Sequence, residues 1–515
     1  MKEETLVFAA LGGLGEIGMN MALYGFGTAK KRQWIMVDCG VSFAGADLWP
    51  RLGAPVYMTP FAANLLEARR YSEESRPHPP VRVIPQRGDF KLGPFHIETI
   101  PVQHSIPESM ALAIRTPLGT VVHTGDWKID ETPVLGEVTD ETRLRAIGDE
   151  GVLALISDST NVTRDGISPS ETDVRASLRD LILNSKGRVA ITTFASNVAR
   201  MRAVAEAAKE AGREVIVVGR AMDRVSDVAG ELDMLGDLPP FASAERFKSI
   251  KRDKCVLLLT GSQGEARAAL ARIASGDHPD VDLAAGDRLI FSSRAIPGNE
   301  KSIGNIINNL VRQGVEVITD RDGLVHVSGH PRRDEMRRMY EWIRPKIAVP
   351  AHGEALHLTL HREFAKAQGV RDVIRAFNGD LVQLAPGRPA IVDEVPVGQL
   401  VKDGHFIISA MDDAIRERRK LGFSGMAVVA IAMDERGNRI GAPDVALIGV
   451  PQQDDEGEQM EDHLRDLVEE VWRSVPKNTR RDPDAVRQAL ERGVRNGLND
   501  LWDKKPYTKV LIVEM

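Results

Sequence analysis

Short apolar runs, interrupted by glycine-rich turns, dominate the first part of the chain. The runs at 5–11, 20–25 and 34–38 predict strands, because each is a brief stretch of apolar and β-branched residues bounded by turn residues. Further strands are predicted at 82–84, 94–101, 110–116, 119–123 and 152–157. This part of the chain is therefore expected to be mostly sheet, with few early helices.

The pattern changes near residue 171, where helical and extended segments begin to alternate. Such alternation is typical of a parallel α/β unit. Helices are predicted at 171–184, 198–211, 265–275 and 301–313, and strands at 188–193, 214–218, 254–260, 287–292 and 316–319. Sheet character returns with a strand at 323–327, a helix at 332–342 and a strand at 346–350. The remainder predicts strands at 426–433, 444–450 and 508–514, with helices at 458–474 and 482–502.

These patterns predict an α/β chain of the α+β sandwich type with three domains. An outer domain comprises 1–170 and resumes at 326–419, and it is interrupted by an inserted α/β domain at 171–325. A small α/β domain occupies 420–515. A length of 515 residues agrees with several hydrophobic cores rather than one.

Composition excludes several classes of protein. With 43% hydrophobic and 27% charged residues the chain is expected to fold. Cys39 and Cys255 cannot form a disulfide framework, which suits a reducing cytoplasm. We expect no signal peptide, and no membrane span, since no run approaches the roughly 18 apolar residues that one needs. A net charge of −7 gives no overall attraction to nucleic acid, so such a substrate would need a local basic channel.

A glycine motif near the start has the residue spacing of the dinucleotide-binding fingerprint but not its structural context. Gly13, Gly15 and Gly18 have the G-x-G-x-x-G spacing, and Asp38 follows where a ribose-binding acid would stand. That fingerprint requires a helix to begin at the glycines, but the segment after them is short and strand-like. We therefore interpret the glycines as a tight hairpin turn.

Histidines and aspartates follow several predicted strands beside small residues. His104, Asp126 and His352 each stand at such a strand end, and their N and O donors suit zinc or manganese. A single histidine in this position is more often a structural hydrogen-bonding group, but three such segments favour metal ligation. Asp158 could orient a ligand or water, and His330 follows small residues whose N–H groups can approach an anion.

Two arginines also stand at strand ends of the inserted domain. Arg220 follows the apolar run 215–219, and Arg294 lies in the segment 292–300. Each is either a solvent-facing loop charge or a phosphate-binding residue.

Together these segments resemble ribonuclease J, a family in the β-CASP branch of the metallo-β-lactamase-fold nucleases. The resemblance runs over nearly the whole chain. It is carried by the segments at 12–20, 123–130, 157–161, 194–197, 259–265, 296–300, 326–330 and 350–354. It implies a metallo-β-lactamase-like αββα domain, an inserted β-CASP domain and a small C-terminal domain. The implied activity is 5′-to-3′ exonucleolytic and also endonucleolytic cleavage of RNA, in RNA maturation and decay.

The resemblance also implies roles for individual residues. His104, Asp126 and His352 match metal ligands, with Asp126 as the bridging carboxylate, while Asp158 and His330 match the first two β-CASP motifs as catalytic residues. His326, Val327, Ser328, Gly329 and His330 resemble a cradle for the substrate backbone. Apart from the resemblance, we assign Arg220 to substrate binding because of its position at a strand end. Asp38 resembles a supporting residue behind the metal ligands. The implied cofactor is zinc, two ions per site in the family, with manganese or magnesium as alternatives.

The chain departs from the family pattern at one place. The family's His-X-His-X-Asp-His motif is expected after Asp38, but here 38–48 runs directly into the segment at 49–57. Either the segment is missing through an error in the recorded sequence, which we favour because the other motifs are intact, or it is a natural deletion. The second alternative would make the chain a catalytically impaired RNA-binding subunit or scaffold.

The expected partners follow from the same resemblance. They are single-stranded RNA with a 5′-monophosphate and further copies of the chain, in a dimer or tetramer. The expected location is the cytoplasm, with no membrane partner. A lactamase-like hydrolase of small molecules is disfavoured, because the inserted domain and the segment at 326–330 would then have no purpose.

Overall fold

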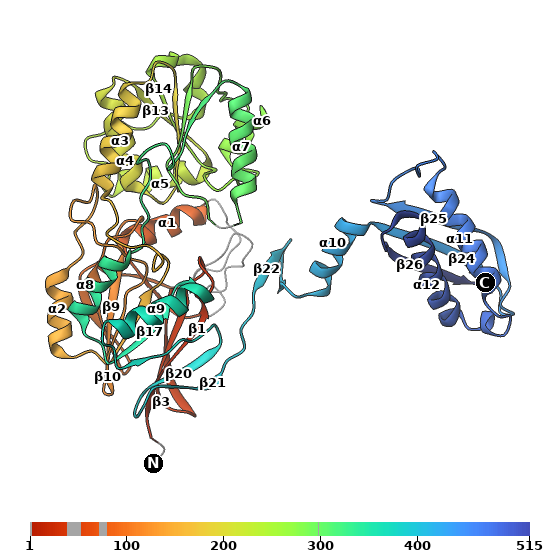
Figure 1. Cartoon of the computed structure of the whole chain (residues 1–515), viewed down its shortest axis with the longest axis horizontal. Helices are drawn as coiled ribbons and strands as arrows, with labels where there is room; N and C mark the ends of the chain where they lie inside the picture. The colour runs from red at the N-terminus through yellow and green to blue at the C-terminus, as the bar shows by residue number, and fades with distance from the viewer. Residues whose placement is uncertain (1–2, 39–52, 72–79, 297) are drawn as a thin grey trace. The chain divides into compact units, whose positions relative to one another are not determined.

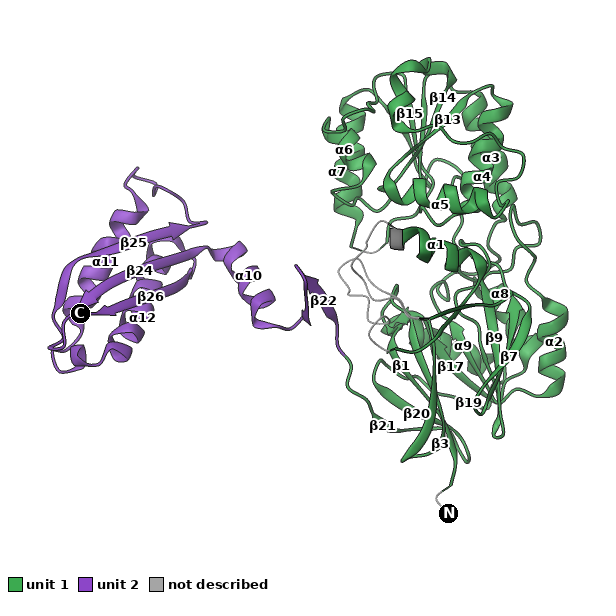
Figure 2. Ribbon diagram, turned by 180° about the vertical axis from the view of Figure 1, so that it is seen from behind, with its two compact units in different colours: residues 1–397 green, residues 398–515 purple. Residues whose placement is uncertain are grey.

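The computed structural model describes residues 3–38, 53–71, 80–296 and 298–515. The chain divides into two compact units, 1–397 and 398–515 (Figures 1 and 2). Of the helices in the described ranges, none has the length and apolarity that crossing a lipid bilayer requires.

Two β-sheets form the base of the first unit. The five-stranded sheet has the order β21 (Ala390–Glu394), β20 (Asp380–Ala385), β1 (Thr5–Gly12), β3 (Met21–Thr28) and β4 (Lys31–Val37). The seven-stranded sheet has the order β19 (Asp372–Val373), β17 (Ile347–Ala351), β11 (Ala154–Asp158), β10 (Gly119–His123), β9 (Met110–Thr116), β8 (Phe95–Pro101) and β7 (Gly88–Leu92).

The two sheets share one apolar core. Phe8 and Tyr24 from the first sheet pack in the same cluster as Ile97, Ile156 and Val349 from the second. The outer face of the seven-stranded sheet is covered by α2 (Glu141–Glu150), α8 (Arg333–Ile343) and α9 (Ala355–Ala367). Two sheets face to face, with helices on the outer face of the seven-stranded sheet, make this the expected α+β sandwich.

The chain between 171 and 318 forms a separate parallel sheet in the upper part of Figure 1. Its order is β13 (Glu214–Val218), β14 (Cys255–Leu259), β12 (Val189–Thr192), β15 (Arg288–Phe291) and β16 (Glu316–Ile318). One face packs against α3 (Glu171–Leu183), α4 (Val198–Glu210) and α5 (Arg220–Glu231), and the other against α6 (Ala269–Ser275) and α7 (Glu300–Arg312). This is the predicted alternation of strands and helices.

Short elements complete the first unit. They are β2 (Leu14–Gly15) paired with β18 (Gly353–Glu354), β5 (Val56–Met58) paired with β6 (Val81–Val83), and α1 (Pro60–Tyr71). Phe61 of α1 is buried in the core that contains α3, α4 and α5. The helix α1 therefore packs on the inserted sheet's layer of helices.

The second unit has a core of its own. Its sheet has the order β25 (Arg439–Ile448), β24 (Met426–Met433) and β26 (Tyr507–Glu514), and α11 (Met460–Ser474) and α12 (Pro483–Trp502) pack on one face. Burial alternates strictly along β24, as expected when only one face of a strand is covered. A hairpin of β22 (Leu400–Asp403) and β23 (Phe406–Ser409) and the helix α10 (Asp413–Ser424) precede it.

The strand predicted at 323–327 is wrong. Residues 323–327 have no strand pairing, although Val325 and Val327 are buried. Side chains satisfy the backbone instead: Arg200 Nη1 and Ser292 Oγ donate to the carbonyl of Val325, at 3.1 and 2.7 Å. An apolar run can thus be buried outside a sheet when side chains replace the ladder hydrogen bonds. The domain boundaries inside 1–397 stay a prediction.

Candidate metal and active site

Three neighbouring strands bring three of the predicted residues to one sheet edge. The strands β10, β11 and β17 are parallel, with His123 opposite Ile156 and Asp158 opposite Ala351. Asp158 is the last residue of β11, Asp126 lies shortly after β10, and His352 follows β17 directly. Because parallel strands end at the same edge, these side chains converge there.

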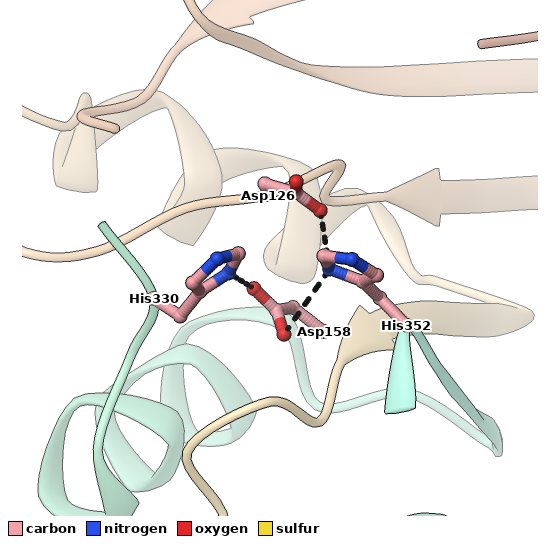
Figure 3. A group of neighbouring side chains, drawn as sticks. All are labelled: Asp126, Asp158, His330 and His352. Carbon is pink, nitrogen blue, oxygen red and sulfur yellow. Dashed lines mark hydrogen bonds and ion pairs between the residues drawn. The ribbon is translucent and has the colours of Figure 1, made fainter. Parts of the chain in front are cut away.

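Asp126, Asp158, His330 and His352 form what we call the carboxylate–histidine cluster (Figure 3). One donor atom from each lies within 4.8 Å of the others. His352 Nδ1 is 2.7 Å from Asp126 Oδ1 and 3.7 Å from Asp158 Oδ1, and His330 Nδ1 is 2.6 Å from Asp158 Oδ2. Asp158 thus lies between the two imidazoles, as Figure 3 shows.

His104 lies beside this cluster. Its Nε2 is 4.0 Å from Asp126 Oδ2, and its ring centroid is 5.0 Å from that of His330. The Nδ1 atom lies 2.8 Å from the carbonyl oxygen of Gly329, which can only accept, so Nδ1 carries the proton in this bond. Burial also lowers the pKa of His104, which favours the neutral ring. A neutral His104 therefore keeps its lone pair on Nε2, on the side of Asp126.

The carboxylates of the cluster remain ionised. Burial raises the pKa of Asp126, but the charge and hydrogen bond of His352 outweigh it, and the net pKa lies well below the usual range. Burial likewise raises the pKa of Asp158, and His330 reverses this effect to leave the pKa lowered. Two negative charges thus stand together in a buried site.

The histidines respond to those charges. Burial lowers the pKa of His352, but Asp126 and Asp158 raise it to about 9. The backbone N–H of Gly18 donates to His352 Nε2 at 3.3 Å, which favours the neutral ring, but the 2.7 Å contact to Asp126 is closer and stronger. Burial lowers the pKa of His330 as well, and Asp158 raises it above its usual value. The carboxylates therefore hold protons on both rings.

The donor set fits a divalent cation. Asp126, His352 and the neighbouring His104 offer one carboxylate and two imidazoles, the mixed O and N ligands that zinc and manganese accept, and three protein ligands with an open position suit a catalytic site. The raised pKa values show that the cluster attracts positive charge, and a cation competes with protons for the same atoms. Asp126 and His352 would hold the ion, with His104 beside them.

The glycine segment at 13–20 supports this site, a role that sequence reasoning missed. Gly13, Gly15 and Gly18 have φ values of 90°, 100° and 122°, and a strand rather than a helix follows them. The segment 13–20 joins the antiparallel strands β1 and β3, as expected of a hairpin, but it is not the tight turn that was predicted, because Gly15 belongs to β2, which pairs with β18. Besides the Gly18 contact to His352, Asn20 Nδ2 donates to Asp126 Oδ1 at 3.1 Å. The turn motif pointed to positive φ values but not to the site that they serve.

Asp38 and its neighbours lie at the edge of the same pocket. Asp38 Oδ2 is 3.7 Å from His123 Nε2, and Tyr24 Oη is 2.7 Å from His123 Nδ1. Burial raises the pKa of Tyr24 well above its usual value, and the charge of Asp38 adds to this effect. The pocket is lined by Asp38, His123, Asp126, Asp158 and His352, among others.

The segment predicted to cradle substrate reaches the cluster through its backbone. Asn161 Nδ2 donates to Ser328 Oγ and to the carbonyl oxygen of His330, both at 2.9 Å. The Val327 side chain packs in an apolar core, so this residue could face a substrate only through its main chain. His326 is half-buried, and its Nδ1 atom is inaccessible to solvent and has no hydrogen-bond partner among the described residues.

Arg220 stands apart in the part of the chain that the structure describes. It is the exposed first residue of α5, and among the described residues no hydrogen bond or ion pair joins it to the cluster. Its role in binding substrate stays a prediction.

Comparison with known proteins places the chain in a family. Residues 186–310 match the family model described as ribonuclease J, beta-CASP domain, and 413–515 match the ribonuclease J C-terminal domain. Residues 314–375 match a Zn-dependent metallo-hydrolase RNA specificity domain. A solved structure of a protein of unknown function from Enterococcus faecalis has a TM-score of 0.54 at 15% identity. It covers 74% of this chain and 100% of its own, and it supports the fold alone.

Several curated proteins named Ribonuclease J are similar over most of the chain. The protein from Sinorhizobium meliloti is 49% identical over 100% of this chain and 98% of its own length. The protein from Corynebacterium glutamicum is 33% identical over 98% of this chain and 75% of its own, and that from Helicobacter pylori J99 is 31% identical over 82% and 67%.

The alignment with the Sinorhizobium protein spans 553 positions, whereas this chain has 515 residues, so at least the difference of 38 positions has no counterpart here. The junction at which the His-X-His-X-Asp-His motif was expected, between Asp38 and Trp49, lies outside the described residues. The family models and the full-length similarity nonetheless agree, and the chain belongs to the ribonuclease J family.

Proposed function

We propose that this chain hydrolyses RNA phosphodiester bonds at the carboxylate–histidine cluster, as a 5′-to-3′ exonuclease that also cleaves internally. Membership of the ribonuclease J family, with a metallo-hydrolase region at 314–375, makes it a metal-dependent ribonuclease rather than the non-catalytic subunit that we considered as an alternative. The observation that carries the proposal is the convergence of two carboxylates and two imidazoles at one sheet edge in a chain of this family.

The proposed cofactor is zinc, with manganese or magnesium as alternatives. When bound, such an ion lowers the pKa of water and polarises phosphate oxygens. The chain supplies the donors: Asp126 and His352, with His104 as a further neutral ligand on the side of Asp126. The Asn20 amide donates to Asp126 Oδ1 and holds this ligand from behind, as outer hydrogen bonds commonly do in metal sites.

His330 and Asp158 provide the proton chemistry. Asp158 Oδ2 accepts from His330 Nδ1 at 2.6 Å, which fixes the ring and raises its pKa. A protonated His330 then presents Nε2–H as a donor to a phosphate oxygen or to the departing oxygen. Charge that develops on the phosphate is stabilised by such a donor more than the ground state is.

The substrate that we propose is single-stranded RNA with a 5′-monophosphate. The segment at 326–330 would hold its backbone through main-chain N–H groups, with Arg220 as a further cation. Contacts of this kind bind phosphates without reading sequence. We also propose a homo-oligomer, dimer or tetramer, in the cytoplasm, by analogy with the family to which the chain belongs.

The activity is tested with 5′-monophosphorylated RNA and added manganese, magnesium or zinc. We expect release of mononucleotides that is abolished by chelation and restored by metal. His330→Ala should reduce the rate about 10²- to 10⁴-fold, which is typical for loss of an acid–base group. Asp126→Ala should have at least as large an effect, because it removes a ligand and the partner of His352.

Asp180→Asn is a matched control, because Asp180 is exposed on α3 and should leave the rate unchanged. Cleavage that survives both His330→Ala and Asp126→Ala would contradict the assignment of roles. Metal analysis separates the alternative function: less than one ion per chain, with intact RNA affinity and no cleavage under any metal, would favour a non-catalytic RNA-binding subunit.

A further inference from the structure

Three arginines from separate segments lie close to the His326–His330 segment. The backbone N–H of Arg333 donates to the carbonyl of Arg164 at 3.0 Å, and Arg332 Nη1 donates to the carbonyl of Ile167 at 3.2 Å. These bonds hold Arg164 and Arg332 in adjoining segments. Arg294, which follows β15, is near enough to act electrostatically on Arg164. The outer and inserted parts of the first unit each supply a member of this group.

The charges of this arginine group are poorly compensated. Within the described residues the Arg164 and Arg332 guanidinium groups have no ion pair, and Arg294 Nε is 3.2 Å from one carboxylate, Asp320. All three side chains are half-buried. Burial lowers the pKa of Arg164, and the like charges of Arg294 and Arg332 lower it further.

Such an arrangement opposes folding. Cations that are partly removed from water need anionic partners, and a shared carboxylate provides only one charge. The arginine group could instead serve to join the outer and inserted parts of the unit. Carboxylates of one part would then be expected to pair with arginines of the other, but the one acidic partner, Asp320, belongs to the same part as Arg294. A bound anion would supply the missing charge, and planar guanidinium groups bind phosphate with two hydrogen bonds each.

The arginine group also adjoins the proposed reaction site. Arg332 is two residues after His330, which limits the distance between their Cα atoms to about 7 Å. Asn161, three residues before Arg164, donates to the carbonyl of His330. Arg294 acts electrostatically on His326, whose Nδ1 is buried without a partner in the described part of the chain. A phosphate held by the arginines would thus be a neighbour of the phosphate that reacts.

We propose that Arg164, Arg294 and Arg332 bind a backbone phosphate of the RNA strand adjacent to the scissile phosphate. This inference rests on the proposed function and adds a binding site to it. The arginines hold the strand by charge and not by base identity, so the site is independent of sequence. They also act on an internal phosphodiester, which distinguishes them from a pocket for the 5′-terminal phosphate.

The test is RNA binding by the full-length chain as a function of salt, with chelator present to prevent cleavage. The probe is one oligoribonucleotide, prepared with a 5′-monophosphate and with a 5′-hydroxyl. Arg164→Gln and Arg332→Gln should each weaken binding several-fold. Each should reduce the slope of log K against log salt, by at most about 0.7, which is the contribution of one whole phosphate contact on a single strand. The loss should be equal for the two probes and for different sequences.

Arg312→Gln is the matched control, since Arg312 is exposed at the end of α7 and its loss removes the same charge. Circular dichroism establishes whether the variants fold. Because two arginines are substituted separately, the test remains valid if one of the two variants does not fold. If Arg164→Gln and Arg332→Gln gave the same salt slope as Arg312→Gln while the wild type still bound and cleaved RNA, the arginine site would be overturned and the proposed function would stand. A loss confined to the 5′-monophosphate probe would overturn the backbone placement. A wild type that binds no RNA would overturn the proposed function together with this site.

Discussion

Gly329 leaves the space in which His104 lies. A Cβ atom at this position would stand 2.5 Å from His104 Nδ1 and 3.0 Å from the backbone nitrogen of Ser105. Gly329→Ala should therefore displace His104 and break its hydrogen bond to the Gly329 carbonyl. We expect about a 10- to 100-fold loss of RNA cleavage, since a misplacement of about 1 Å has this effect in active sites. Cleavage rate and zinc affinity are the measurements.

A glycine six residues earlier in the chain offers a control for that substitution. Gly323 is exposed, and a Cβ atom there would meet nothing within 4 Å, so Gly323→Ala should leave cleavage and metal affinity unchanged. If Gly329→Ala cleaved RNA as fast as Gly323→Ala, the position of His104 would not matter to the reaction.

At the scale of elements, the strand ends that carry the site residues could be predicted from the sequence, but the contacts that other segments make with those residues could not. The apolar runs before Asp126, Asp158 and His352 identify strands, and parallel pairing brings their ends together. The sequence does not indicate that a distant turn contacts the site. Gly18, for example, donates a hydrogen bond to His352, which lies 334 positions later in the chain. Contacts of this kind depend on how two sheets pack, which local patterns do not encode.

Some elements were also missed for local reasons. The helices α5 and α9 were not expected, and the strand expected at 323–327 did not form. The apolar pattern of 323–327 predicted correctly that the segment is buried. The segment does not form a strand, however, because its side chains pack in the core around α4 and Arg200 donates a hydrogen bond to its backbone. An apolar run predicts an interior position more securely than it predicts a strand.

The helices α3 and α4 are joined by a buried ion pair. Glu171 Oε2 accepts from Arg200 Nη2 at 2.8 Å, and both side chains are almost completely inaccessible. Glu171→Gln should leave the Arg200 charge buried without a counter-charge, which costs about 3 kcal/mol of unfolding free energy. Urea denaturation of the wild type and the variant measures this cost.

An exposed pair on the same two helices provides the comparison. Arg179 of α3 and Glu210 of α4 form an ion pair at the surface, where water and salt screen the charges. Glu210→Gln should leave the denaturation midpoint unchanged. Equal losses from Glu171→Gln and Glu210→Gln would show that burial does not set the value of the inner pair.

Over the whole molecule, the first unit holds both the proposed site and a buried histidine that takes no part in it. His361 lies between Ser159 Oγ, 2.8 Å from its Nδ1, and Tyr340 Oη, 2.9 Å from its Nε2. Burial lowers the pKa of His361 to about 3 and raises that of Tyr340 above its usual value. The first unit therefore folds around an uncharged imidazole at every pH near neutrality.

This neutral ring makes stability depend on pH with a definite sign. In the unfolded chain His361 takes up a proton below its ordinary pKa of 6.5, whereas in the folded chain it stays neutral down to about 3. Its contribution is therefore complete above pH 6.5 and is lost progressively as pH falls toward the folded value. Between pH 7 and pH 5 we expect His361 to account for about 2 kcal/mol of lost stability.

His361→Gln should remove this part of the pH dependence, although it lowers stability at pH 7 by breaking one of the two hydrogen bonds. The control is His357→Gln, one turn earlier on α9, where the ring is partly exposed and the wild-type pH profile should persist. Hydrogen exchange of amides in β11 and β17, at pH 7 and pH 5, measures the stability of the first unit without interference from the second. If His361→Gln lost as much protection on acidification as His357→Gln, the buried ring would not be the group that couples folding to pH.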